Sequence, residues 1–586
     1  MLLSDLVVTT VLSESAVIAV GASSRTPRTL SKANGTFVHE SVAMERWCVA
    51  RKDLRYLRHV VCDFTERRLM RPTVDDPFDP SDGEIGPSMY TVNDQLIRPV
   101  TRRAGDCSWA LMCHPKGRKC DLFITHGWQE GVYDFIDKVL NSWPWGAQSA
   151  YCCMLSNPQN LEIGELIASP DQSPFAKALK SATWMMVVPN HRTSVFTRIW
   201  CAYEAYMAYS WNKTIVTARA PIRNFWWHLS MPFAVTLVLA CISVGWMVLF
   251  EQRTLQDLLL PCFRRYEMRR DFVFVAATLF FKRFLFAKFL ALAGFFLSAC
   301  GVGLSLKYSL FLIEGSCSML CLIFFVLAEA ERMTSVQIGK QSKQLQAGYS
   351  GYITDARSSD ENDRRRILEE IQGKERDVDH VVDVLIEIGL STDHLRRASR
   401  KGVDLRTGAD SKFSVFIMLS GHFLLRAAVW QWDYPLSFFL LCAIAWMCIY
   451  AMSSCERKAF AASSAYRVFL LQLVLCFGIG AARRDDGDPT PLTYMILFPI
   501  VICCSALGPA GVASIPALGP FLANLLISNS IASIARSACP LCFHSTQSRI
   551  YSSSPSTSSA GEETSADEET PLAAGAQCAS GVVQCN

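Results

Sequence analysis

Residues 196–206 read Phe-Thr-Arg-Ile-Trp-Cys-Ala-Tyr-Glu-Ala-Tyr, and this stretch decides the fold of the first half of the chain. An apolar run at 184–188 precedes it and is typical of a buried strand, and a β-rich run at 213–217 follows it. About three turns of helix fit between the two runs. On that helix Trp200 and Glu204 are four residues apart and share one face. The pattern therefore predicts a strand–helix–strand unit that carries an indole and a carboxylate at the rim of a sheet.

The alternation of strand and helix patterns extends back to residue 118. The periodicity predicts strands at Cys120–Thr125, Tyr151–Leu155 and Thr183–Val188, and helices at Val132–Trp143 and Pro174–Ser181. Continuous apolar strands separated by helices indicate an α/β domain with a parallel sheet that is covered on both faces. Ligands of such sheets bind beyond the carboxyl ends of the strands, and His126 and Trp128 follow the first strand at that edge.

The segments at 121–126, 184–189 and 198–204 resemble a Toll/interleukin-1 receptor (TIR) domain, most closely the divergent TIR-like modules of plants and unicellular eukaryotes. They read Asp-Leu-Phe-Ile-Thr-His, Trp-Met-Met-Val-Val-Pro and Arg-Ile-Trp-Cys-Ala-Tyr-Glu. The resemblance implies a flavodoxin-like, TIR-like α/β fold for residues 116–222. It also implies that this domain signals by self-association.

In plant TIR domains a Trp-Cys-x-x-Glu stretch contains the glutamate required to cleave the nicotinamide–ribose bond of NAD⁺. Trp200 and Glu204 occupy the matching positions, so the resemblance implies that Glu204 is catalytic and that NAD⁺ is a substrate, with no bound cofactor. His126, Trp128 and Trp200 are then candidates for substrate binding. One loop departs from the family, because His-Gly-Trp-Gln-Glu-Gly at 126–131 replaces its usual Arg-rich loop. The phosphate-contacting side of an NAD⁺ pocket is therefore left unassigned.

Elementary chemistry allows Glu204 to be either a catalytic residue or a structural one. A carboxylate near the anomeric carbon stabilises the oxocarbenium-like state through which an N-glycosidic bond breaks, and it can also hold the ribose hydroxyls. Trp128 and Trp200 can stack on a flat base. In the alternative, Trp200 fills the core, Glu204 is a solvated helix residue, and the domain is a non-enzymatic scaffold that recruits partners. A pocket that brings Glu204 near Trp128 favours the enzyme.

The composition indicates a membrane protein. Hydrophobic residues make up 51% of the 586 residues and charged residues only 19%, an unusual balance for a soluble chain. We expect an α-helical bundle with about three transmembrane helices in residues 223–330 and four or five in residues 412–536, with the lipid bilayer as a partner. The net charge of +4 is too small to indicate nucleic-acid binding.

Two charged residues, Glu314 and Arg426, fall inside expected spans. Ionisable residues in a membrane are candidate functional sites. Together with a broken apolar run at 272–306, they support a third alternative, a transporter or channel with a cytosolic regulatory domain. The NAD⁺ chemistry implied by the resemblance places the TIR-like domain in the cytosol.

Three further segments complete the expected organisation. Residues 1–115 are expected to be partly ordered, with pieces that pack on the next domain, and residues 537–586 to form a disordered tail. Within this last part of the chain, Cys539, Cys542 and His544 make only half of a zinc motif, so no metal site is predicted.

Residues 331–411 are expected to form a polar helical segment. The pattern predicts helices at Asn362–Gln372 and Val378–Ile388, with Gly389 as the C-cap of the second. The apolar face of this helix needs a partner, which is the TIR-like domain, the first helix or another subunit. Three preceding spans would place the segment on the side of the membrane opposite to the TIR-like domain, but we expect the same side.

Overall fold

The structure is a computed structural model of the chain. It describes residues 35–161, 169–249, 286–308, 312–358, 360–405, 413–429, 436–452, 458–465 and 490–527, and a few single residues or pairs between them.

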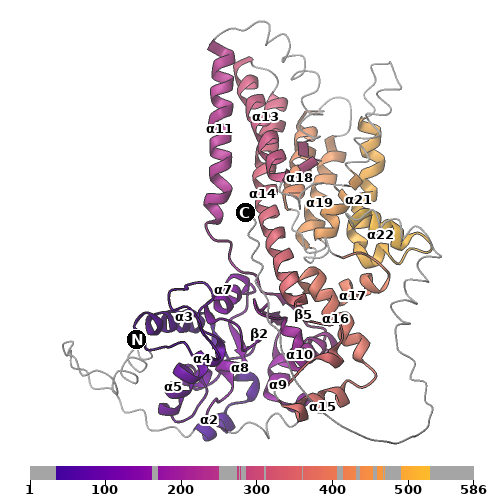
Figure 1. The fold of residues 1–586 in the computed structure, drawn as a ribbon. Coiled ribbons are helices and arrows are strands. Elements are labelled where there is room, and N and C mark those ends of the chain that lie inside the picture. Colours follow the sequence, from indigo (N-terminus) through magenta and orange to yellow (C-terminus); the bar gives the residue numbers. More distant parts are fainter. Residues whose placement is uncertain are drawn as a thin grey trace, which may run out of the picture. The chain divides into compact units, whose positions relative to one another are not determined.

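A six-stranded sheet lies at the centre of the α/β part (Figure 1). Its strands are β1 (Val49–Ala50), β2 (Leu122–Thr125), β3 (Ser149–Cys152), β4 (Trp184–Val187), β5 (Thr214–Thr217) and β6 (Leu390–Ser391), in the order β1-β3-β2-β4-β5-β6. The four central strands are parallel, whereas β1 and β6 pair antiparallel at the two edges. The predicted α/β class is confirmed, but the sheet is mixed rather than wholly parallel, because both edge strands come from outside residues 116–222.

The order of the parallel strands creates a switch point. The chain passes from β2 to β3 on one side, and then returns to β4 on the other side of β2. The connections therefore diverge between β2 and β4. In open α/β sheets this divergence leaves a crevice at the carboxyl ends of the two strands, where ligands bind.

Each face of the sheet is covered by helices, because neighbouring residues of a strand point to opposite faces. Leu122 and Ile124 of β2 pack with α3 (Arg51–Glu66) and α7 (Val132–Ser142). Phe123, between them, packs on the other face with residues of α9 (Pro174–Ser181), α10 (Ile199–Ser210) and α16 (Glu375–Ile388). The predicted helices at 132–143 and 174–181 are therefore confirmed, the first with its end one residue earlier.

Short helices fill the loops of the α/β part. They are α2 (Gly35–Ser41), η1 (Met44–Arg46), α4 (Met89–Val92), η2 (Asn93–Ile97), α5 (Arg98–Arg103), α6 (Trp109–Cys113), α8 (Cys153–Ser156), η4 (Pro170–Gln172), η5 (Val195–Thr197), η6 (Ile353–Asp355), α15 (Glu361–Glu370) and α17 (Asp393–Arg400). α8 replaces the second half of the strand predicted at 151–155, because the chain turns into a helix directly after Cys152.

Segments on both sides of residues 116–222 belong to the same core. From the N-terminal region, β1 pairs with β3, and Leu54 of α3 is fully buried. From the middle segment, β6 pairs with β5, and Val381 and Leu385 of α16 pack against α10. The partner of the apolar face of α16 is therefore the α/β domain. Gly389 ends this helix at a positive φ of 69°, a conformation that glycine adopts without steric cost, as predicted for the C-cap. The middle segment is thus part of the α/β domain.

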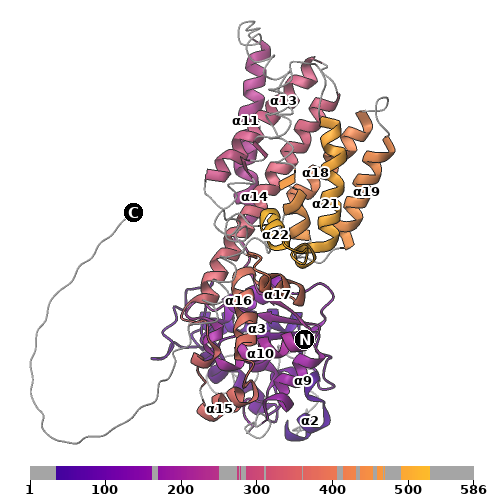
Figure 2. The same ribbon diagram turned by 90° about the vertical axis from the view of Figure 1, so that its right-hand side faces the viewer.

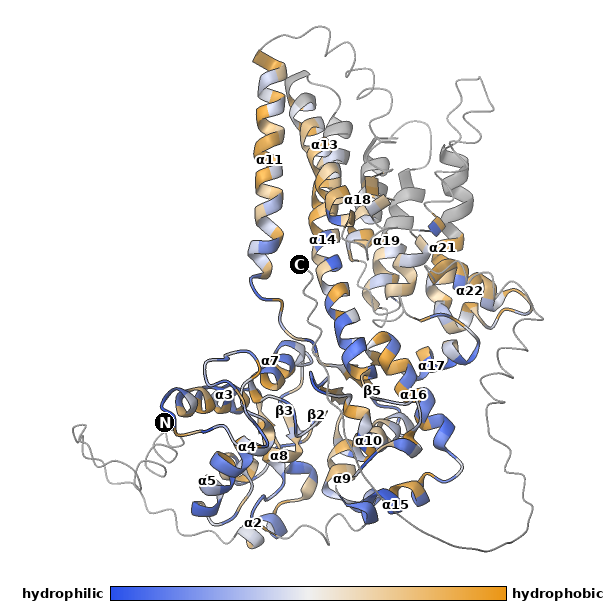
Figure 3. Ribbon diagram, in the orientation of Figure 1, coloured by the Kyte–Doolittle hydropathy of each residue, from blue (hydrophilic) through white to orange (hydrophobic). Residues whose placement is uncertain are grey.

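The other helices are mainly apolar, except that the C-terminal half of α14 is hydrophilic (Figure 3). They are α11 (Phe225–Leu249), α13 (Phe286–Tyr308), α14 (Leu312–Gln346), α18 (Phe413–Val429), α19 (Leu436–Met452), α21 (Thr490–Val512) and α22 (Gly519–Ile527). Within the described residues, two helices are long and apolar enough to cross a membrane, one at 225–249 and one at 286–303. Only 11% of the apolar stretch in α11 is buried, whereas a core helix of a soluble protein is mostly buried.

The long helix α14 links the apolar helices to the sheet. In both views it runs beside α13 and α18 (Figures 1 and 2). Gly294 of α13 allows this approach, because a Cβ there would lie 2.3 Å from the ring of Phe325 on α14. At the other end, Leu345 is fully buried in the core of the α/β domain. The carbonyl of Ala347 then accepts a hydrogen bond of 2.8 Å from the backbone N–H of Ser194.

Candidate functional site

A pocket of about 590 Å³ lies at the switch point, and we call it the switch-point pocket. Three segments line it: Gly127–Gln129 after β2, residues 190–198 after β4, and residues 348–358 after α14. Tyr90 closes it on another side, with its ring centroid 5.4 Å from that of Trp128. A pocket of this volume accommodates a ligand as large as a nucleotide.

A buried ion cluster connects the two loops that line the pocket after β2 and β4. The ammonium of Lys138, on α7, is 2% exposed and donates to the carboxylates of Asp134 (2.6 Å) and Glu130 (3.5 Å). It also donates to the carbonyl of Pro189. Glu130 follows the Gly127–Gln129 loop and Pro189 precedes the 190–198 segment, so one side chain fixes both loops relative to α7. Burial raises the pKa of Glu130 well above its ordinary value, although the nearby ammonium lowers it.

Glu204 is buried and does not line the pocket. It is 6% exposed, in the second turn of α10, and Arg198 is the N-cap residue of that helix. Burial raises the pKa of Glu204 to about 7, while the Thr125 hydroxyl and the Arg198 guanidinium oppose the rise. Both Trp128 and Glu204 lie close to Cys153. Both residues therefore interact with Cys153, and of the two only Trp128 lines the pocket.

His126 supports the floor of the site. Its ring is 3% exposed, and its Nε2 lies 3.4 Å from the sulfur of Cys153 and 3.6 Å from that of Cys152. Burial, assisted by the charge of Arg198, lowers the pKa of His126 to about 4. The imidazole is therefore neutral at pH 7. The lining residues of the pocket do not include it.

Trp200 lies away from the pocket. Its indole N–H donates to a carboxylate oxygen of Asp363 at 3.2 Å, and its ring packs on Phe175 at 5.4 Å. Trp200 and Glu204 are one turn apart, as predicted, but they contact different elements because α10 is covered on more than one side. Trp200 anchors α15 and Glu204 faces β2.

The sequence pattern did not reveal the residues that complete the pocket. Tyr90 and Arg357 come from the two regions flanking the predicted domain, and neither lies in a recognisable motif. Lys138 fits the polar face of an amphipathic helix, and only the tertiary fold buries it. Arg198 was part of the motif that identified Glu204, and its position one residue before the helix was the available signal.

Several predicted residues fall outside what the structure describes. Glu314 and Arg426 belong to α14 and α18 by their backbones, but their side chains are outside the described residues, as are Cys539, Cys542 and His544. Over the described part of the chain, no group of three or more His, Cys, Asp or Glu side chains could hold a metal ion.

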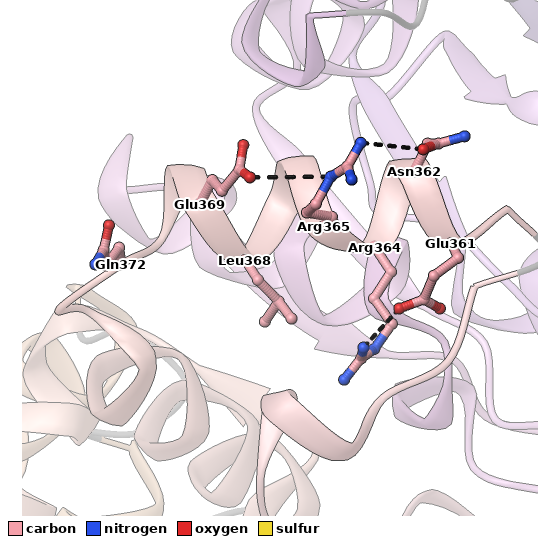
Figure 4. Close-up of a pocket in the computed structure, with 7 residues that line it drawn as sticks. All are labelled: Glu361, Asn362, Arg364, Arg365, Leu368, Glu369 and Gln372. Carbon is pink, nitrogen blue, oxygen red and sulfur yellow. Dashed lines mark hydrogen bonds and ion pairs between the residues drawn. The ribbon is translucent and has the colours of Figure 1, made fainter.

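A second hollow, of about 440 Å³, lies along the outer face of α15 (Figure 4). Arg364 pairs with Glu361 at 2.8 Å, and Arg365 lies between Asn362 at 3.1 Å and Glu369 at 4.0 Å. The charges of this face neutralise one another along a single helix. It is a solvated helix surface and offers no convergent binding groups.

Comparisons of the chain with models of known protein families, with curated proteins and with solved structures find no match.

Proposed function

We propose that this chain is a multi-pass membrane protein whose α/β domain binds NAD⁺ in the switch-point pocket and cleaves its nicotinamide–ribose bond. One observation carries the proposal: Glu204 is a buried carboxyl with a pKa raised to about 7, and it interacts electrostatically with Arg198, which lines this pocket. Perturbed carboxyls beside a pocket of this kind are typical of catalytic sites.

The strand order supports the resemblance to a TIR-like fold. Numbered along the chain, the four parallel strands lie in the order second, first, third, fourth. This is the beginning of the flavodoxin-like order, in which ligands bind between the first and third strands. In this chain those strands are β2 and β4, and the switch-point pocket lies at their carboxyl ends.

In the proposed reaction the bond between the ribose C1′ and the nicotinamide nitrogen breaks, and its electron pair leaves with neutral nicotinamide. The Glu204 carboxylate stabilises the positive charge that develops on the ribose. Water then adds to C1′ and gives up a proton, so that the products are nicotinamide, ADP-ribose and H⁺. The ring of Trp128 packs against the nicotinamide end. Because Glu204 is buried and does not line the pocket, substrate binding must displace side chains of the lining to reach it.

Two further features, the long apolar helices and an exposed tryptophan, support the membrane and signalling parts of the proposal. Two helices long and apolar enough to cross a membrane, at 225–249 and 286–303, support the membrane location. The proposed reaction requires the α/β domain to be in the cytosol, where NAD⁺ is available. Trp145, in the loop between α7 and β3, is 98% exposed. An exposed indole is a suitable anchor for self-association of the domain. If the pocket has no catalytic activity, the same features describe a scaffold that assembles at a membrane.

We expect the full-length protein in lipid nanodiscs to consume NAD⁺, and Glu204→Gln to lower the rate by about 10²–10³-fold, the range for removal of one group that stabilises transition-state charge. The parent kcat/KM should rise with pH through about 7, as the carboxyl ionises. The measurement is nicotinamide release, followed by chromatography at several pH values.

Asp363→Asn is the matched control, because it changes a buried carboxyl on the same side of the sheet that does not line the pocket. Its activity should stay within a few-fold of the parent. A folded parent that releases no nicotinamide at high protein density would favour the scaffold. Equal rates of nicotinamide release in the parent and in Glu204→Gln would show that Glu204 is not catalytic.

A further inference from the structure

We propose that Arg198 and Arg357 form a clamp for the diphosphate of a nucleotide in the switch-point pocket. The two residues are far apart in the sequence, but they face each other across an isolated parallel bridge. The backbone N–H of Arg357 donates to the carbonyl of Thr197 at 2.7 Å, and the N–H of Ile199 donates to the carbonyl of Arg357 at 2.9 Å. Residues paired in this way project their side chains to the same side. Both arginines line the pocket.

The charged groups around this pair of arginines favour binding of an anion. In the part of the chain that the structure describes, neither guanidinium forms an ion pair, whereas all three arginines of the neighbouring helix α15 do. Asp355 is the one carboxylate in the described lining, and it is paired with neither arginine. Glu204 interacts with Arg198, but burial raises its pKa to about 7, so it is only partly ionised near neutral pH. The two arginines therefore give the pocket lining an excess of positive charge.

The other lining groups narrow the ligand to a nucleotide. A guanidinium binds phosphate oxygens through two parallel N–H donors, so two arginines match the two phosphates of a diphosphate. Next to them, the pocket has the rings of Tyr90 and Trp128 for a flat base, and the hydroxyls of Ser350 and Thr193 for sugar or phosphate oxygens. This arrangement supplies the phosphate contacts that the loop at 126–131 lacks.

The two arginines of the clamp come from different parts of the fold, one from the sheet and one from the segment that follows the apolar helices. Arg198 caps α10 of the sheet, whereas Arg357 belongs to the segment that follows α14, the long helix of the apolar bundle. Ser194 and Ala347 already join the two segments through a backbone hydrogen bond. A diphosphate held by both arginines therefore strengthens this junction. The identity of the nucleotide as an NAD⁺ fragment rests on the proposed function, but diphosphate binding does not require cleavage.

The test is calorimetric titration of ADP-ribose, ADP and adenosine into the full-length protein in nanodiscs. We expect Arg198→Gln and Arg357→Gln each to weaken ADP-ribose and ADP binding by about 10–100-fold, the range for hydrogen bonds to a charged group. Adenosine, which has no phosphate, should bind the parent and both variants equally. Arg365→Gln, an exposed arginine of α15 outside the pocket, is the control and should leave all three affinities unchanged.

Thermal unfolding of each variant shows whether it is folded, and Arg357 is exposed, so its replacement should leave the fold intact. Loss of ADP-ribose affinity in both arginine variants supports the clamp even if the parent never cleaves NAD⁺, in which case the proposed reaction alone fails. Unchanged affinity in folded Arg357→Gln, or a folded parent that binds neither ADP-ribose nor ADP at millimolar concentration, overturns the clamp.

Discussion

Replacing Lys138 with methionine should lower the free energy of unfolding by about 3–5 kcal/mol, the range for breaking a buried ion pair from one side. The side chain is 2% exposed, and its ammonium bonds two carboxylates and the carbonyl of Pro189. Methionine has similar length, so the loss is electrostatic rather than a cavity. Glu130, which is fully buried, would be left without its cation. Urea unfolding of the full-length protein in detergent, followed by tryptophan fluorescence, gives the measurement.

Two further variants separate this explanation from a general effect of losing a lysine. Lys180→Met, at an exposed position of α9, should change the free energy of unfolding by less than about 0.5 kcal/mol. The double variant Lys138→Met with Glu130→Gln should recover much of the loss, because the buried carboxylate is gone. The penalty of Lys138→Met should also be smaller at acidic pH, where Glu130 is protonated. If Lys138→Met costs less than about 1 kcal/mol, the cluster does not fix the loops.

The elements predicted from the sequence are those with a local signal. The strands near 122, 184 and 214 and the helix that carries Glu204 all follow from runs of apolar residues and their spacing. The edge strands β1 and β6 have two residues each, too few for any periodicity, and they exist because β3 and β5 offer unpaired backbone groups. The core could thus be predicted, and its edges could not.

In the candidate site, too, some features follow from local sequence and others depend on tertiary contacts. The position of Glu204 follows from a short motif, and its burial follows from the packing of α10. Arg357 reaches the pocket because the chain returns from the apolar helices and pairs with the backbone around Arg198. No spacing rule connects two residues in that way. Trp200 was expected beside the substrate, but its hydrogen bond to Asp363 also depends on this returning segment.

The same returning segment relates the pocket to the membrane part of the chain. Residues 348–358 form one wall of the pocket, and α14, which precedes them, packs along α13 and α18. A shift of α14 along its axis would displace Arg357 and Tyr349 relative to the loops after β2 and β4. Under the proposed function, we therefore expect ligand binding at the pocket and the arrangement of the apolar helices to be energetically coupled.

Glu204→Gln should make the folded protein more stable at pH 8, by about 3 kcal/mol relative to the parent. The pKa of Glu204 is about 7 in the folded state, against an ordinary value of 4.5, and this difference corresponds to about 3 kcal/mol. Because the folded pKa is the higher one, the folded state binds the proton more tightly. The bound proton on Glu204 stabilises the folded state fully below about pH 4.5, and this stabilisation is lost as the pH rises through 7. Glutamine stays neutral, so the variant does not lose this stability.

The measurement is the urea unfolding midpoint of parent and variant at pH 5 and pH 8. Burial also raises the pKa values of Asp379 and Asp383 to about 6, so the parent has other sources of pH dependence, and the difference between the two proteins isolates Glu204. Glu369→Gln, an exposed carboxyl on α15, should show no such difference. A variant that is less stable than the parent at pH 8 would contradict the prediction. A more stable variant that no longer cleaves NAD⁺ would identify Glu204 as a group kept for chemistry at the expense of stability.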